Sequence, residues 1–79
     1  MGNLSSVSAR EAVRAFEKVG FTIVSQRGSH IKMRRALISG KTETIIIPNH
    51  KHLKEGTLRK GILRAIGMAT KEFITLLKK

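Results

Sequence analysis

RGSHIKMRR, residues 27–35, is the segment that decides the fold of this chain. It follows residues 21–26, which are rich in β-forming side chains, and beyond Gly28 it alternates between polar and apolar residues, as a half-buried strand does. Gly28 stands where a tight turn needs a residue that tolerates a positive φ. The sequence therefore predicts a β-hairpin with its turn at Gly28 and Ser29.

The alternation assigns the side chains of the second predicted strand to two faces. His30, Lys32 and Arg34 share one face, and Ile31 and Met33 share the other. The histidine is therefore expected beside a row of positive charges, which favour the neutral imidazole. A neutral imidazole next to fixed cations can hold a phosphodiester and remove a proton from it without a metal ion.

A helix is predicted before the hairpin. Ser8 and Glu11 have the spacing of a capping box, so the helix should begin near Ala9, and Gly20 suits its C-terminal end. One side of this helix is expected to be buried, and the other to carry a column of basic residues. The buried side comprises Ala9, Ala12, Val13, Phe16 and Val19, and the basic column comprises Arg10, Arg14 and Lys18.

A third strand is predicted over residues 43–47, after a loop over residues 36–42. Its run Ile45-Ile46-Ile47 is continuous, although alternation can bury only one face of an open sheet. Either Ile46 or its neighbours should therefore lie on the face of His30, where an apolar spot favours a protein partner. The alternative is a strand that is covered on both sides.

Two more helices are expected. The first should begin at Gly56-Thr57, where Lys54 and Arg59 make a candidate phosphate site, and end at Gly67. Its expected buried stripe is Leu58, Ile62, Ala65 and Ile66, with Lys60 and Arg64 facing away. The last helix is short, follows Ala69, and directs Phe73, Leu76 and Leu77 inward.

The element order is thus α-β-β-β-α with a short C-terminal helix, in one domain over residues 1–79. Two helices on one face of a three-stranded antiparallel sheet make an α+β sandwich. Double-stranded RNA-binding domains have the same element order, but a fold does not by itself decide function.

Composition narrows the function. Sixteen Lys and Arg against five Glu give a net charge of +11, which favours a polyanionic partner, nucleic acid before an anionic membrane surface. The chain has no Cys, which fits a cytoplasmic protein, and no apolar run near the roughly 20 residues that a membrane span needs. The membrane-surface alternative would need an exposed amphipathic helix, whereas the predicted helices are committed to the core.

The residues also limit the chemistry. The glutamates are scattered, which disfavours a two-metal nuclease, and the absence of Asp excludes a Ser-His-Asp triad, so that Ser29 is expected to act in the turn. His50 and His52 lack further zinc ligands nearby, and neither a metal nor a cofactor is expected. RNA supplies its own nucleophile, the 2′-OH, so cleavage requires mainly a proton acceptor and cations. On the residues alone, a surface histidine that only contacts a phosphate is the simpler interpretation.

Five segments in this order resemble the HicA toxins of bacterial and archaeal toxin-antitoxin modules, and the likeness runs from about Leu4 to Leu77. The segments are Ser6–Glu11, Glu17–Phe21, Gln26–His30, Ile47–His50 and Leu53–Lys60. The resemblance implies a double-stranded-RNA-binding-like fold and a metal-independent mRNA interferase that halts translation. It also implies a HicB antitoxin that covers the active site.

By the same resemblance His30 is the catalytic residue, and Gly28 and Ser29 fix its turn. His50 matches a histidine common after the third strand in the family, which either holds the loop or contacts substrate. The candidate RNA contacts are the basic residues of the predicted faces: Lys32, Arg34, Arg10, Arg14, Lys54, Lys60 and Arg64. The competing hypothesis is a non-catalytic RNA-binding module that uses the same residues.

Overall fold

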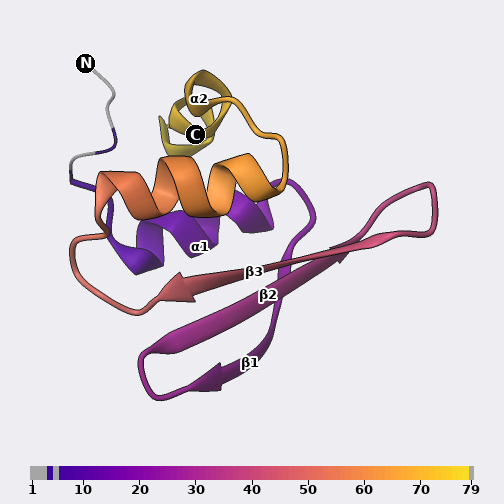
Figure 1. The fold of residues 1–79 in the computed structure, drawn as a ribbon, viewed down its shortest axis with the longest axis horizontal. Helices are drawn as coiled ribbons and strands as arrows, with labels where there is room; N and C mark the ends of the chain where they lie inside the picture. Colours follow the sequence, from indigo (N-terminus) through magenta and orange to yellow (C-terminus); the bar gives the residue numbers. More distant parts are fainter. Residues whose placement is uncertain (1–3, 5, 79) are drawn as a thin grey trace.

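The computed structural model describes residue 4 and residues 6–78 of the chain. Its elements follow one another in the predicted order (Figure 1). They are α1 (Ala9–Glu17), β1 (Thr22–Arg27), β2 (His30–Ala36), β3 (Thr42–Pro48), the π-type helix η1 (Thr57–Leu63) and α2 (Thr70–Lys78). The predicted α+β class, with the order α-β-β-β-α, is confirmed.

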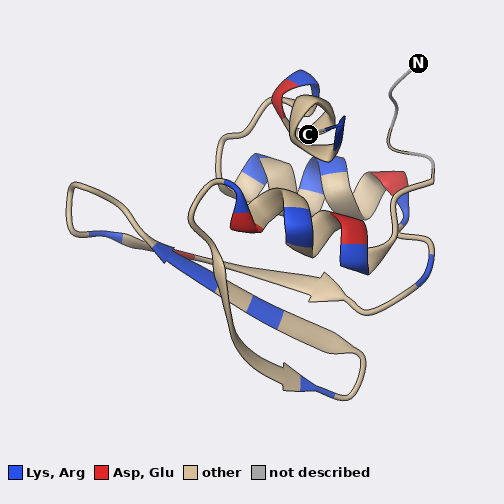
Figure 2. Ribbon diagram, turned by 180° about the vertical axis from the view of Figure 1, so that it is seen from behind, with Lys and Arg blue, Asp and Glu red and all other residues tan. Residues whose placement is uncertain are grey.

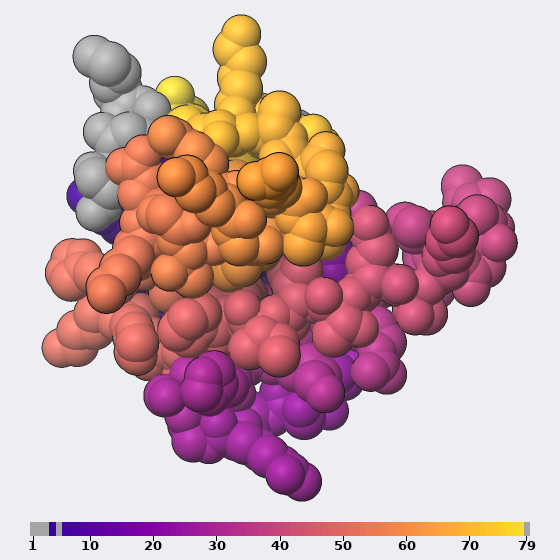
Figure 3. Space-filling model, in the orientation of Figure 1, coloured from indigo at the N-terminus to yellow at the C-terminus, as the bar shows by residue number. Residues whose placement is uncertain are grey.

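The three strands form one antiparallel sheet in the order β1-β2-β3, so β2 is central and the other two are edge strands. Helices α1 and η1 lie over one face of the sheet, and α2 packs on these two helices on the side away from the strands (Figure 1). The space-filling view in Figure 3 shows the β1–β2 turn projecting below this body and the loop over residues 37–41 projecting to one side. The opposite face of the sheet carries no described helix.

The core lies between the helices and the sheet. Ile31, Met33, Ile45 and Ile47 enter it from the sheet, each at most 6% exposed. Above them the three phenylalanines are buried, and the ring of Phe16 lies 5.7 Å from that of Phe21 and 5.1 Å from that of Phe73. This cluster joins α1 and the entry to β1 to α2, which lies far from both in the sequence.

Both ends of α1 follow from local sequence. The side-chain oxygen of Ser8 accepts a hydrogen bond from the amide of Glu11 at 3.1 Å, and the Glu11 carboxylate accepts one from the amide of Ser8 at 2.9 Å. At the other end the Gly20 amide donates to Glu17 and the Phe21 amide to Phe16, both at 3.1 Å. This is a Schellman motif, and Gly20 has the positive φ of 99° that it requires. The predicted capping box and the glycine stop are confirmed.

Helix η1 differs from its prediction. Leu58 and Ile62 are buried as expected, but Ala65 is exposed and Leu63 is buried in its place. The i→i+5 bonding of a π-helix widens each turn, so an apolar stripe read at α-helical spacing drifts off the buried side. The prediction for Ala65 was wrong for this reason.

At the start of η1, one cation of the candidate phosphate site is engaged within the chain. Helical backbone begins at Glu55, and the amide of Leu58 donates to the carbonyl oxygen of Lys54 at 3.2 Å. The Glu55 carboxylate then pairs with Arg59 at 2.8 Å. Arg59 is therefore paired with a carboxylate, and the phosphate site stays a prediction.

We expect Phe16→Ala to lower the free energy of unfolding by about 3–5 kcal/mol, because it removes the ring that touches both other aromatic rings of the core. Urea unfolding followed by circular dichroism measures the loss. Ile38→Ala is the matched control: Ile38 is fully exposed in the loop after β2, and its truncation should change stability by no more than about 0.5 kcal/mol. Equal losses in the two variants would contradict this account of the core.

Candidate functional site

The open face of the sheet carries the side chains that alternate with the core. Directly opposed residues of antiparallel strands project on the same side, so the pairing identifies this face. Its central row is His30, Lys32 and Arg34 of β2, which lie opposite Arg27, Ser25 and Thr22 of β1 and opposite Pro48, Ile46 and Thr44 of β3. The predicted division of β2 into a basic face and an apolar face is confirmed.

The turn that holds His30 is built from Gly28 and Ser29. Gly28 has a φ of 54°, in the region that favours glycine, and the two-residue turn places Arg27 directly opposite His30. The carbonyl oxygen of Ser29 accepts a hydrogen bond of 2.6 Å from the amide of Asn49. The chain after β3 therefore anchors the turn, and with it the start of β2.

A hollow of about 490 Å³ lies on this face around His30. It is lined by Ser25, Arg27, His30, Lys32 and Ile46. The imidazole is exposed, two cationic side chains share the hollow with it, and no carboxylate lines it. Such a hollow can receive a phosphate group next to a group that accepts a proton.

Ile46 supplies the apolar wall of the hollow. Its side chain is 49% exposed and lies opposite Lys32, whereas Ile45 and Ile47 are 3% and 0% exposed. Ile46 therefore interrupts the open face as the sequence predicted, and the alternative of a third strand covered on both sides is wrong.

The remaining predicted basic residues are not gathered at His30. Arg34 lies one pair further along β2, where its Nε donates to Thr44 Oγ1 at 3.3 Å. Arg10 and Arg14 line a separate groove between α1 and β1. Three others lie exposed on η1 and its flanks, outside the hollow: Lys54, Lys60 and Arg64.

Arg35, next to Arg34 in the sequence, is committed to structure. Its guanidinium donates hydrogen bonds to the Glu43 carboxylate at 2.8 Å and to the carbonyl oxygen of Val19 at 2.9 Å. It also stacks 4.6 Å above the centre of the Phe21 ring. The Arg35–Glu43 ion pair, only about one-fifth exposed, joins β2 to β3, and the bond to Val19 joins β2 to the chain just after α1. This arginine is therefore unavailable to a ligand on the open face.

The backbone of His50 holds α1 in place, because its carbonyl oxygen accepts a hydrogen bond of 2.9 Å from the amide of Ala9. In the same segment, the amide of Leu53 donates a hydrogen bond of 2.7 Å to the carbonyl oxygen of Val7. The side chains of His50 and His52 are exposed. Within residues 4 and 6–78, no three His, Cys, Asp or Glu side chains are grouped so that they could hold a metal ion.

Two lining residues, Arg27 and Ser25, were not among the predicted site residues. The signal for Arg27 was available, since the residues that flank a two-residue turn face each other. Ser25 could be placed in the same way, because counting back from the turn pairs it with Lys32. A register shift follows only beyond Ser25, where Ile23 pairs with Met33. This bulge turns Ile23 away from the basic face and brings Thr22 opposite Arg34.

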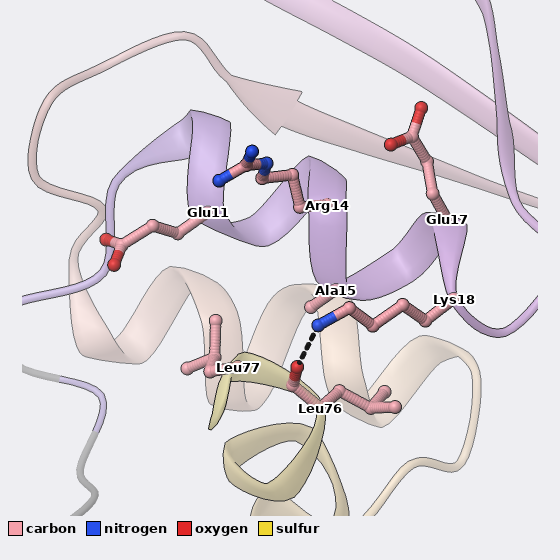
Figure 4. Close-up of a pocket in the computed structure, with 7 residues that line it drawn as sticks. All are labelled: Glu11, Arg14, Ala15, Glu17, Lys18, Leu76 and Leu77. Atoms are coloured by element: carbon pink, nitrogen blue, oxygen red, sulfur yellow. Dashed lines mark hydrogen bonds between the residues drawn. The ribbon is translucent and has the colours of Figure 1, made fainter. Parts of the chain in front are cut away.

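A larger hollow, of about 560 Å³, lies between α1 and α2 but has a different character (Figure 4). Its lining includes two carboxylates, those of Glu11 and Glu17, beside two cations, Arg14 and Lys18, so its charges balance. Lys18 Nζ donates to the carbonyl oxygen of Leu76 at 2.8 Å and so ties the end of α2 to α1. This hollow is an inter-helix seam rather than a site for an anion.

The charge distribution over the molecule agrees with the difference between the His30 hollow and the hollow between α1 and α2. Figure 2 shows basic residues along the strands and around the helices, whereas the acidic residues lie mainly on the helices. No described helix is long and apolar enough to cross a membrane.

Comparison with known families gives one match. The family described as the HicA toxin of bacterial toxin-antitoxin systems matches residues 9–68, which include α1, the whole sheet and η1. Comparisons with curated proteins and with solved structures give no match. Because the family match covers most of the 79 residues, the chain belongs to the HicA toxin family of bacterial toxin-antitoxin systems.

Proposed function

We propose that this toxin is a metal-independent endoribonuclease that cleaves mRNA in the cytoplasm and thereby inhibits translation, with His30 as its general base. The observation that carries the proposal is the exposed imidazole in a hollow that it shares with Arg27 and Lys32, without a carboxylate in the lining. These are the groups needed to bind a phosphodiester and take up one proton.

The reaction uses a nucleophile within the substrate. The neutral imidazole of His30 accepts the proton of a ribose 2′-OH, and the 2′-oxygen attacks the adjacent phosphorus. A new 2′-O–P bond forms as the P–O5′ bond breaks, which leaves a 2′,3′-cyclic phosphate on one product. The departing 5′-oxygen takes up a proton and becomes the hydroxyl of the other product, so no oxidant or metal is required.

Negative charge increases on the phosphate as the reaction proceeds, and fixed cations aimed at that charge lower the barrier. Arg27, opposite His30, and Lys32, two residues further on, are the cations that line the hollow. Arg34 extends the same row along the RNA, while Gly28 and Ser29 hold the turn from which His30 projects. The guanidinium of Arg27 can bind two phosphate oxygens at once.

Base recognition is expected to be weak. Single-stranded RNA is usually held by stacking its bases on aromatic rings, but all three phenylalanines are buried and the chain has neither Trp nor Tyr. Binding therefore depends on phosphates, which contribute affinity without reading sequence and make that affinity fall steeply with salt.

The proposed partner is a HicB-like antitoxin that covers the open face. Ile46 gives such a partner an apolar anchor at the wall of the hollow, and the charge of +11 favours an acidic surface on the antitoxin. A partner seated on Ile46 would exclude RNA from His30.

The test of the catalytic proposal is His30→Ala. We expect the variant to lose at least about 10²-fold in RNA cleavage, because it removes the general base, while it keeps its fold and most of its RNA affinity. Cleavage of single-stranded RNA by antitoxin-free protein, measured in the presence of a chelator, gives the rate. RNA with 2′-O-methyl groups should resist the wild-type protein, since it lacks the nucleophile.

His52→Ala is the matched control, because His52 is exposed but lies outside the hollow, and it should cleave at nearly the wild-type rate. Wild-type protein that leaves RNA intact in chelator would favour the non-catalytic RNA-binding module. A His30→Ala variant that still cleaves would remove the proposed mechanism.

A second prediction concerns the antitoxin. Ile46→Asp should weaken antitoxin binding by about tenfold or more, since it replaces an apolar anchor at the interface with a charge that must be desolvated. Titration calorimetry with the purified antitoxin measures the affinity. Ile38→Asp, in the exposed loop after β2, introduces the same charge away from the hollow and should bind normally. Unchanged affinity of the Ile46 variant would show that the anchor is elsewhere.

A further inference from the structure

We propose that the groove between α1 and β1 is a second RNA-binding site, and that the substrate is a single strand that bends around the edge of β1 to occupy this groove and the His30 hollow together. The inference rests on the proposed function for the nature of the ligand. It adds the path of the RNA across the molecule and its strandedness.

The groove, of about 280 Å³, lies on the helix side of the sheet. Arg10 and Arg14 line one wall from α1, and Gln26 lines the other from β1, with Asn49 also part of the lining. Ile31, which is buried beneath the helices, contributes to its apolar part. Two guanidinium groups and two residues with side-chain amides around one groove can hold phosphate and ribose oxygens.

The charges of this groove are available to a ligand. The ion pairs found within residues 4 and 6–78 involve Arg35 and Arg59, and neither Arg10 nor Arg14 takes part in one. No carboxylate lines the groove itself. Arg14 lies between the groove and the seam between α1 and α2, which it also lines. The groove and the His30 hollow therefore share the features that favour a polyanion.

The two sites lie back to back across one strand. Gln26, in the groove, and Arg27, in the hollow, are consecutive residues of β1, and consecutive strand residues project to opposite faces. β1 is an edge strand, and all six of its residues are exposed. A chain that passes around this free edge reaches both sites by the shortest route.

This geometry selects a single strand. A double helix is a stiff rod, with a persistence length of about 50 nm for DNA, and cannot reverse around one β-strand. A single strand has rotatable backbone bonds at every nucleotide and can do so. The element order shared with double-stranded RNA-binding domains therefore does not extend to the mode of binding.

The experiment measures the affinity of the full chain for a fluorescent 2′-O-methyl RNA of about 16 nucleotides by anisotropy. This RNA lacks the nucleophile, so binding is observed without cleavage and independently of the role of His30. We expect Arg10→Ala/Arg14→Ala to bind the single strand about tenfold more weakly, and to reduce the slope of log affinity against log salt by about 1.4, as two lost phosphate contacts would.

Lys41→Ala/Lys71→Ala is the matched control, because it removes two positive charges from exposed positions outside the groove and the hollow. It should lower affinity far less. Gln26→Glu changes the opposite wall of the groove and should weaken binding of the same RNA. Because Gln26 lies in β1, this loss cannot come from a general effect of changing α1. A duplex of equal length should show no greater loss with the arginine variant than with the control.

The proposal is overturned if the arginine variant binds the single strand as well as the control does, or if it loses affinity for the duplex to the same extent. It is also overturned if RNA binding is unchanged while antitoxin binding weakens, since the groove would then be a protein-docking surface. Cleavage that persists in His30→Ala would count against the catalytic proposal alone, because the anisotropy experiment does not use that residue.

Discussion

The structure depends on the fact that helices cover only one face of a three-stranded sheet. Ile31, Met33, Ile45 and Ile47 must point toward the helices to form the core, and the period of two along a strand then forces His30, Lys32 and Ile46 to the other face. A slip of one residue would bury the cations and expose the core. The same burial that stabilises the sheet therefore sets the composition of the candidate active site.

Most of this arrangement could be predicted because its signals are local. The capping box at Ser8, the glycine turn at Gly28 and the helix stops at Gly20 and Gly67 each depend on residues that are close in the sequence. The alternation after Gly28 likewise needed no knowledge of the partner strands. Local signals of this kind agree with one another in this chain, and because they agree, the order of the elements could also be predicted.

The features that were missed depend on tertiary structure. The register shift between Ile23 and Ser25 decides that Thr22, and not Ile23, lies opposite Arg34 on the open face. The widened turns of η1 moved burial from Ala65 to Leu63. The separation of Arg10 and Arg14 from His30 depends on where α1 lies over the sheet. The hydrophobic periodicity of the sequence carries no information about the register shift, the width of the helical turns or the position of α1 over the sheet.

The positions of the carboxylates explain how so basic a chain can fold and still present cations to a ligand. Glu11 caps α1, Glu43 holds Arg35 against Phe21, and Glu55 pairs with Arg59, so these carboxylates serve the scaffold. None of them lines the His30 hollow or the groove between α1 and β1. The uncompensated charge is thus left on the surface, the hollow and the groove included, where self-repulsion decreases when an acidic partner or a polyanion binds. Ligand binding and relief of that repulsion are then one and the same electrostatic effect.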